Sequence, residues 1–302
     1  MAPTFKLMGG LGNQLFVYSA AVHYAIESNQ TVSIDPQFAA GAVKGGNHHK
    51  YSSSLQELHL DPRVKLAEPR DNPRNAALNF LSDVRLRLFA KESGLLPTHG
   101  DCGGMGEAVS DKALYVRGYF QRHKYLEGLK RRQEWTTPQP KTITSEAHEL
   151  GLRIVNQRGV ILHVRRGDYT SLGSSFGVLG LTYYLRALEG IEQSRGELGK
   201  VFIFSDEPSY VKTVMAPMLS KSFDVEVIKP LSSPEQDLYA MSQGSSFVLA
   251  NSSFSWWAAN LNSGPDTSVV AYPQPWFRTS KFSNDLFPES WLPVNSDWNS
   301  DD

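Results

Sequence analysis

Adjacent arginines, Arg165 and Arg166, follow an apolar run at residues 160–164 that predicts a β-strand. Strand alternation would place Arg165 on the same face as His163 and Arg166 on the opposite face. Two guanidinium groups at a strand end can hold phosphate oxygens through paired hydrogen bonds, and Asp168 could orient one of them. The pattern indicates an anion site, and a solvated turn with an Arg–Asp ion pair is an alternative of equal weight.

A second anion site is indicated after the predicted strand at residues 247–250. Asn251, Ser252, Ser253 and Phe254 follow this strand and begin a predicted helix. Asn and Ser are favourable helix caps, and a helix N-terminus presents free backbone N–H groups to a phosphate. Ordinary capping is the alternative, and the two interpretations are compatible. We expect the tryptophan pair that follows to pack in the core.

Carboxylates near the ends of other predicted elements could contact a nucleoside. Asp206 and Glu207 follow a predicted strand at residues 201–204, and Asp237 lies in a predicted helix at residues 235–243. A carboxylate can accept hydrogen bonds from ribose hydroxyls, or from both the N1 and N2 hydrogens of guanine. Surface carboxylates without a ligand are the alternative.

A glycine-rich turn joins the first predicted strand, residues 4–8, to the first predicted helix, residues 13–27. Gly10, Gly12 and Asn13 lie in or directly after this turn. Small residues between a strand and a helix admit the close approach of a ligand to the backbone.

The same turn raises a rival hypothesis, an NAD-dependent oxidoreductase. Asp35 ends the second predicted strand, residues 31–34, where a ribose-binding acid would lie. The third glycine of the dinucleotide fingerprint would fall at Leu15, which is too large for the usual close packing of helix on strand. The rival is therefore weak.

The first half of the chain begins as strand, turn, helix and strand, which is typical of a parallel sheet covered by helices. Residues 36–110 are irregular, with one predicted helix at residues 75–90, and form either an acceptor-facing region or surface padding. A strand is predicted at residues 113–118. Helices at residues 123–134 and 145–157 flank a connection that contains prolines.

Beyond this connection strands and helices alternate regularly, which indicates a second parallel α/β half. We therefore predict two domains, residues 1–150 and 151–302. The polar end at residues 295–302 is expected to fray. Strands are predicted at residues 160–164, 201–204, 225–228, 247–250 and 269–271, and helices at residues 182–193, 209–215, 235–243 and 254–261.

Composition argues against several classes of function. Thirty Lys plus Arg against 31 Asp plus Glu leave a net charge of -1, so no global field favours nucleic acid or an anionic membrane. Cys102 is the only cysteine, which excludes an internal disulfide framework and fits a reducing compartment; we expect an inert thiol. Residues 1–8 lack a secretory signal and no window is apolar enough to cross a bilayer, so we expect a cytoplasmic protein without stable membrane insertion, or one whose anchor was removed.

Taken together, the motifs resemble the inverting α-1,2-fucosyltransferase family, whose members use GDP-fucose. The similarity runs in the family's order over residues 5–277 and is weakest at residues 36–110. The five segments that carry it are Met8-Gly-Gly-Leu-Gly-Asn-Gln-Leu-Phe16, Gly118-Tyr-Phe-Gln-Arg-His-Lys-Tyr125, His163-Val-Arg-Arg-Gly-Asp-Tyr169, Phe204-Ser-Asp-Glu207 and Asn251-Ser-Ser-Phe-Ser-Trp-Trp-Ala258.

The resemblance implies an α/β fold of the GT-B architecture, with two facing Rossmann-like domains that contain parallel sheets and a donor bound mainly by the second. It implies Arg165 as the chief ligand of the donor phosphates, with Arg166 and Asp168 in support. His163 and Asp237 are implied as guanine contacts. The residues implied at the diphosphate are Ser252, Ser253 and Phe254, with Asn13 approaching the sugar or the β-phosphate.

The leaving diphosphate gains negative charge as the glycosidic bond breaks, and this charge must be stabilised. The chain has no Asp-x-Asp sequence, and its histidines, including His48 and His49, lack metal-ligand spacing. We expect the arginines and the helix N-terminus near Ser253 to take the place of a metal, as in the resembling family. Asp168 is the first candidate for a general base and Glu207 the second, unless the transition state needs little base assistance.

The predicted activity is transfer of L-fucose from GDP-β-L-fucose to the 2-hydroxyl of a terminal galactoside, with inversion and an α-1,2 linkage. The expected partners are GDP-fucose and a galactose-terminated glycan, with no nucleic acid, no metal and no other cofactor. Besides the oxidoreductase, a sugar-nucleotide-binding protein without activity remains an alternative.

Overall fold

The structure is a computed structural model that describes residues 3–36, 54–67, 115–116, 118–132, 135–171, 176–262, 268–278 and 284–298. The chain divides into two compact units. Unit 1 comprises Met1–Pro138 and Ser283–Leu286, and unit 2 comprises Gln139–Phe282 and Phe287–Asp302. The helix predicted at residues 75–90, the His48–His49 pair and Cys102 lie outside the described residues. The domain limits of 1–150 and 151–302 remain a prediction.

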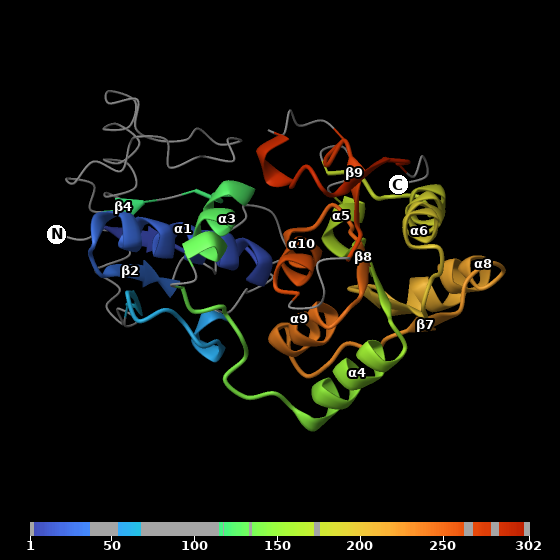
Figure 1. Cartoon of the computed structure of the whole chain (residues 1–302), viewed down its shortest axis with the longest axis horizontal. Helices are drawn as coiled ribbons and strands as arrows, with labels where there is room; N and C mark the ends of the chain where they lie inside the picture. Colours follow the sequence, from blue (N-terminus) through green and yellow to red (C-terminus); the bar gives the residue numbers. More distant parts are fainter. Residues whose placement is uncertain are drawn as a thin grey trace. The chain divides into compact units, whose positions relative to one another are not determined.

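Unit 1 contains a parallel four-stranded sheet in the order β3-β2-β1-β4. Helix α1 (Leu11–Ser28) leaves the sheet through the glycine turn and ends at Asn29, whose φ of 51° is the left-handed conformation typical of a helix end. Helix α3 (His123–Arg132) packs beside it (Figure 1). The strands are β1 (Thr4–Lys6), β2 (Val32–Asp35), β3 (Val64–Leu66) and β4 (Tyr115–Val116), and the short helices are η2 (Leu55–Glu57) and η4 (Asn284–Leu286).

Helix α1 is buried on most sides, so its polar groups must find partners inside unit 1. The Tyr18 hydroxyl accepts a hydrogen bond from the Asp61 backbone N–H at 2.9 Å and donates one to the Thr136 carbonyl at 3.1 Å. The Asp61 carboxylate in turn accepts from the Thr136 N–H at 3.1 Å. These bonds fix the segment that leaves unit 1.

Unit 2 contains a parallel six-stranded sheet in the order β10-β9-β8-β5-β6-β7. Every residue of the central strand β5 is buried, as expected of a parallel strand covered on both faces. The strands are β5 (Val160–Val164), β6 (Val201–Ser205), β7 (Val225–Val227), β8 (Ser246–Val248), β9 (Val270–Gln274) and β10 (Leu292–Asn295).

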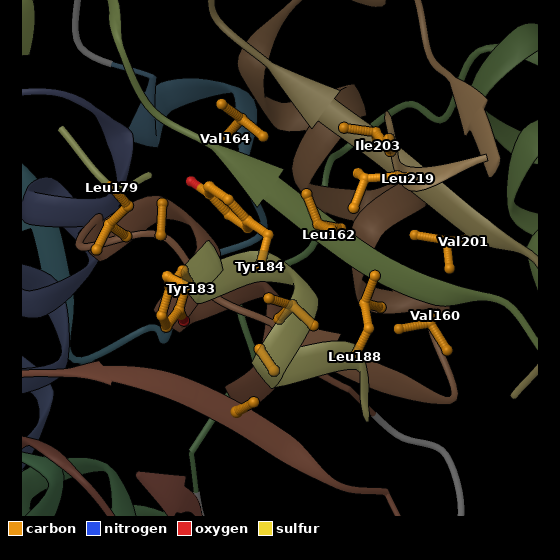
Figure 2. Packing of buried hydrophobic residues seen from close by; sticks show 14 of the residues in the cluster. Val160, Leu162, Val164, Leu179, Tyr183, Tyr184, Leu188, Val201, Ile203 and Leu219 are labelled. Atoms are coloured by element: carbon orange, nitrogen blue, oxygen red, sulfur yellow. The ribbon is translucent and has the colours of Figure 1, made fainter. Parts of the chain in front are cut away.

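The core of unit 2 lies between this sheet and α6 (Leu181–Arg195). Figure 2 shows Tyr183, Tyr184 and Leu188 of α6 against Leu162 of β5, and all four side chains are fully buried. Each such side chain stabilises the fold by about 1.5–3 kcal/mol relative to exposure. The remaining helices are α4 (Ser145–Asn156), α5 (Gly167–Ser171), α7 (Pro208–Tyr210), the π-helix η3 (Val211–Met215), α8 (Ala216–Leu219), α9 (Pro234–Ser242) and α10 (Ser253–Asn260).

The α/β class with parallel sheets is confirmed in both units. The elements that were not predicted are the strands β3 and β10 and the short helices η2, α5, α8 and η4. The expected fraying of residues 295–302 is wrong for residues 295–298, because Asn295 pairs with Gln274 and Trp298 forms a bridge with Leu179. None of the helices in the described ranges is both long and apolar enough to cross a membrane.

Candidate functional site

The chain order of the sheet in unit 2 reverses at β5, which pairs with β6 on one side and with β8 on the other. In parallel α/β sheets the carboxyl ends of all strands share one edge, and ligands bind where the order reverses. The predicted site residues at 165–168, 206–207 and 251–254 follow β5, β6 and β8, respectively. Their strands therefore lead to the same edge of the sheet.

Arg165 lies between two carboxylates at this edge. Its Nη2 donates to Asp168 Oδ1 at 2.6 Å, and its Nη1 lies 2.9 Å from Asp206 Oδ2. Its guanidinium carbon is 5.4 Å from the centre of the Tyr169 ring, within the range of a cation–π contact. The side chain remains 27% exposed, so an anion from solvent can reach it. The expected Arg–Asp pair thus exists, together with a second acidic partner.

Arg166 is held more tightly than Arg165. Its Nε donates to Glu207 Oε2 at 2.9 Å, and its guanidinium lies 3.7 Å from the centre of the Tyr210 ring. The side chain is only 11% exposed. This environment supports a role in maintaining the loop, whereas Arg165 is the more accessible cation.

Asp206 connects the two arginines. Oδ2 pairs with Arg165, and Oδ1 accepts a hydrogen bond from the Arg166 backbone N–H at 3.0 Å. Gly167 allows this approach, because a Cβ atom there would lie 2.5 Å from Asp206 Oδ2. Two arginines and three carboxylates, Glu207 included, give this arginine network a formal charge of -1. Any anion that binds Arg165 must therefore compete with these carboxylates.

His163 is a neutral group in the last part of β5. The side chain is 5% exposed, and burial, assisted by the positive charge of Arg165, lowers the pKa of His163 to about 3. Its Nδ1 has no hydrogen-bond partner among the described residues. The ring centre lies 5.9 Å from that of Phe254. Nδ1 is thus a buried hydrogen-bonding atom that no described residue satisfies.

Helix α10 begins at Ser253, one residue before the predicted start, with Ser252 as its N-cap. The Ser252 hydroxyl accepts from the Phe254 N–H at 3.3 Å, and Ser253 is the first helical residue. Asn251 is fully buried, and its Nδ2 donates to backbone carbonyls rather than to the helix. The expected packing of the tryptophan pair in the core is confirmed, since Trp256 and Trp257 are both fully buried.

Asp237 lies on α9, outside the arginine network. Its Oδ1 accepts from the Leu231 N–H at 3.0 Å. Burial raises the pKa of Asp237 to about 6; the bond from Leu231 opposes this, and the nearby charges of Glu146 and Glu235 add to it. Among the described residues, Asp237 makes no hydrogen bond or ion pair with the arginine network.

The glycine turn of unit 1 is held by neutral amides. Gly9 adopts a positive φ of 69°, Gly10 is the extended N-cap of α1, and Gly12 is buried in its first turn. The fully buried Gln14 donates from Nε2 to the Gly9 carbonyl at 3.0 Å and accepts from the Ser54 N–H at 3.1 Å.

Asn13 is oriented by a second amide. Its Oδ1 accepts from Gln121 Nε2 at 2.8 Å. A Cβ atom at Gly9 would lie 2.6 Å from Asn13 Nδ2, so the turn and this amide are packed closely. The amide is therefore fixed in direction, which a ligand-binding role requires.

Sequence reasoning missed four residues that support these sites: Tyr169, Tyr210, Gln14 and Gln121. Tyr169, Gln14 and Gln121 all lie within the motifs quoted above, so their position in a motif could have identified them. Nothing in the sequence around Tyr210 indicated a contact with Arg166. Within the described ranges no group of three or more His, Cys, Asp or Glu side chains is placed to hold a metal ion.

The sequence is similar to those of known glycosyltransferases. The sequence model described as Glycosyl transferase family 11 matches residues 100–295. An alpha-1,2-colitosyltransferase of Escherichia coli is 28% identical over 96% of this chain and 97% of its own, and the O-antigen biosynthesis glycosyltransferase WbnK of Escherichia coli is 24% identical over 95% and 98%. These matches do not support the oxidoreductase alternative.

A solved structure shows the same fold. A mutant of Arabidopsis thaliana FUT1 in complex with GDP superposes with a TM-score of 0.51 and 13% identity, covering 96% of this chain and 76% of that one. The fucosyltransferase NodZ from Bradyrhizobium gives a TM-score of 0.49 and 14% identity, over 86% and 93% of the two chains.

Proposed function

Because the chain belongs to glycosyl transferase family 11, we propose that it transfers L-fucose from GDP-β-L-fucose to the 2-hydroxyl of a terminal galactoside, with inversion and an α-1,2 linkage. The observation that carries the proposal is the pairing of β5 with β8. This pairing leads the accessible Arg165 and the N-terminus of α10 to one edge of the sheet. The α-1,2 linkage in the name of the colitosyltransferase relative supports the bond that is formed.

Arg165 is the proposed ligand of the donor diphosphate, together with the first N–H groups of α10. A guanidinium presents five N–H donors in a planar fork that matches the oxygens of a phosphate. The positive end of the α10 dipole adds to the attraction. Together they would stabilise the charge that develops on the leaving GDP, which is the basis for proposing a metal-independent reaction.

His163 and Asp237 are the proposed guanine contacts. Both have the chemistry: His163 has a buried nitrogen without a partner, and Asp237 has a carboxylate with one oxygen outside its bond to Leu231. The proposed general base is Asp168, with Glu207 as the second candidate. Each carboxylate already accepts from an arginine, so donor binding that engages Arg165 would release Asp168 from its partner.

The sugar of the donor is the finer question, because a relative is named for colitose. Colitose is L-fucose without its 3-hydroxyl. A site that hydrogen-bonds this hydroxyl rejects the sugar that lacks it by about 10⁴-fold, whereas an apolar pocket distinguishes the two only about 10²-fold. The ratio of kcat/KM for GDP-fucose and GDP-colitose with one β-galactoside therefore decides which donor is used.

The first test is calorimetric titration of the purified chain with GDP, ADP, UDP and NAD in EDTA. Selective binding of GDP, followed by turnover of GDP-fucose with a galactoside in EDTA, is the expected result. Binding of NAD without GDP would overturn the proposal. A loss of turnover in EDTA that magnesium restores would overturn its metal-independent part, and GDP binding without turnover of either donor would favour a non-catalytic sugar-nucleotide-binding protein.

A further inference from the structure

A tyrosine of the short helix α5, which follows the two arginines, also contacts the start of α10. Tyr169 lies in α5, and its hydroxyl donates to the Asn251 carbonyl at 3.1 Å. Asn251 directly precedes Ser252, the N-cap of α10. One side chain of α5 therefore fixes the backbone from which α10 begins.

The ring of Tyr169 contacts the accessible cation of the site. The Arg165 guanidinium carbon lies 5.4 Å from the ring centre, and the Phe176 ring stacks on Tyr169 at 5.0 Å with an angle of 21° between the planes. A cation at this distance from the face of an aromatic ring is attracted to it. The ring therefore restricts where the Arg165 guanidinium can lie.

Asn251 closes the arrangement into a cycle. Its Nδ2 donates to the carbonyls of Phe176 at 3.0 Å and Gly177 at 3.1 Å, and the side chain is fully buried. Tyr169 thus bonds Asn251, Asn251 holds the segment of Phe176, and Phe176 stacks on Tyr169. Tyr169 and Phe176 are half-buried and Asn251 is fully buried. A network whose members support one another loses more than one contact when one member is removed.

We infer that Tyr169 is a positioning residue for the donor diphosphate. It sets the position of the Arg165 guanidinium relative to the N–H groups at the start of α10. Two phosphates in one ligand must meet both partners at once, so a shift of either partner by about 1 Å weakens binding and turnover. The inference rests on the proposed function, because it takes the ligand to be a nucleoside diphosphate.

The test compares two substitutions that each remove one tyrosine hydroxyl. Tyr169→Phe keeps the ring and loses the bond to the Asn251 carbonyl. Tyr183→Phe is the matched control, because the Tyr183 hydroxyl donates to the Leu249 carbonyl, two residues before Asn251, from the core helix α6. Both variants lose a bond to the segment 249–251, but only the first affects a residue that contacts Arg165.

Two readouts are measured, hydrogen exchange of the amides of residues 253–256 without ligand, and the Kd for GDP by calorimetry. Tyr169→Phe should exchange faster than the control at these amides, and its Kd for GDP should rise about fivefold, as expected for one lost hydrogen bond. Tyr183→Phe should keep the Kd for GDP within about twofold of that of the unsubstituted chain, even if its Tm falls as much as the Tm of Tyr169→Phe. Tyr169→Leu, which removes the ring as well, should weaken GDP binding further.

Equal exchange and equal Kd in Tyr169→Phe and Tyr183→Phe would overturn the inference. Failure of the proposed function gives a different result, because the unsubstituted chain would then not bind GDP. The exchange experiment needs no nucleotide, so it still decides whether Tyr169 holds the start of α10.

Discussion

Two turns of this molecule each join a strand to a helix, but different kinds of interaction hold them. In unit 1 the glycine turn joins β1 to α1, and in unit 2 the arginine turn joins β5 to α5. Neutral amides hold the first, with Gln14 fully buried. Ion pairs hold the second, and the Arg165 side chain is 27% exposed.

The difference indicates what each turn is built for. A buried amide whose partners are backbone groups costs free energy when it is removed, because those groups are left without partners. Half-exposed ion pairs contribute little to stability, since water and salt screen them, and their members can exchange one partner for another. We therefore expect substitutions in the arginine turn to change ligand binding, and substitutions in the glycine turn to change stability.

The largest effect is expected for Arg165→Ala. Turnover of GDP-fucose should fall by about 10³-fold, the upper end of what one charge-stabilising group contributes, and GDP binding should weaken severely. The measurement is kcat/KM with GDP-fucose, alongside Tm. Arg153→Ala is the control, because Arg153 also pairs with a carboxylate of unit 2, Glu226 at 2.7 Å, but is 51% exposed and outside the site. Turnover in Arg165→Ala equal to that of the control would refute the role in phosphate binding.

Gly167→Ala should disturb the arginine turn without changing its charge. The new Cβ would lie 2.5 Å from Asp206 Oδ2, so the carboxylate that joins Arg165 to the Arg166 backbone must move. We expect the Kd for GDP to rise about tenfold, equivalent to about 1.4 kcal/mol. Gly128→Ala serves as the control, since its Cβ would meet the nearest atom, in His23, at an ordinary 3.5 Å. An unchanged Kd would mean that the position of Asp206 does not matter for the ligand.

Gln14→Leu tests the other side of the comparison. The substitution leaves the Gly9 carbonyl and the Ser54 N–H without their partner, so the free energy of unfolding should fall by about 2 kcal/mol. Denaturant titration measures this loss, with Gln157→Leu at an exposed helix end as the control. If Gln14→Leu left stability unchanged but weakened GDP binding as much as Gly167→Ala, the proposed division between the two turns would be wrong.

The strands of unit 2 show which elements could be predicted from the sequence and which could not. The strands of unit 2 were predictable because apolar runs such as Val160–Val164 and Val201–Ser205 have no alternative to burial in a parallel sheet. The strand β10 was not, because Pro293 lies within its four residues, and a proline suits an edge strand as well as a loop.

At the site, the residue types were predictable and their partners were not. The sequence indicated Arg165, Asp168 and Asp206, but the strand order that puts Asp206 against Arg165 depends on long-range pairing of β5 with β6. The contact of Arg166 with Tyr210 depends on the same pairing together with the course of the chain after β6. Burial of His163 follows from the sheet as a whole rather than from its neighbours in the chain.

Asp237→Asn separates a carboxylate outside the arginine network from those within it. The pKa of Asp237 is raised to about 6 in the folded chain, above the value of about 3.9 for an unfolded chain. The folded state therefore binds the proton more tightly, so this group lowers stability as pH rises from about 4 to about 6 and has no further effect above that. Asparagine carries no charge and can still accept from the Leu231 N–H. The Tm difference, variant minus unsubstituted chain, should be near zero at pH 4, grow through this window and stay constant at higher pH. Asp224→Asn is the control, because Asp224 is 72% exposed beside Lys200 and its substitution should cause no such rise in Tm.

The same variant tests whether Asp237 also contacts guanine. If it does, the preference for GDP over ADP should relax in Asp237→Asn. A rise in Tm with unchanged selectivity would assign Asp237 to the fold alone.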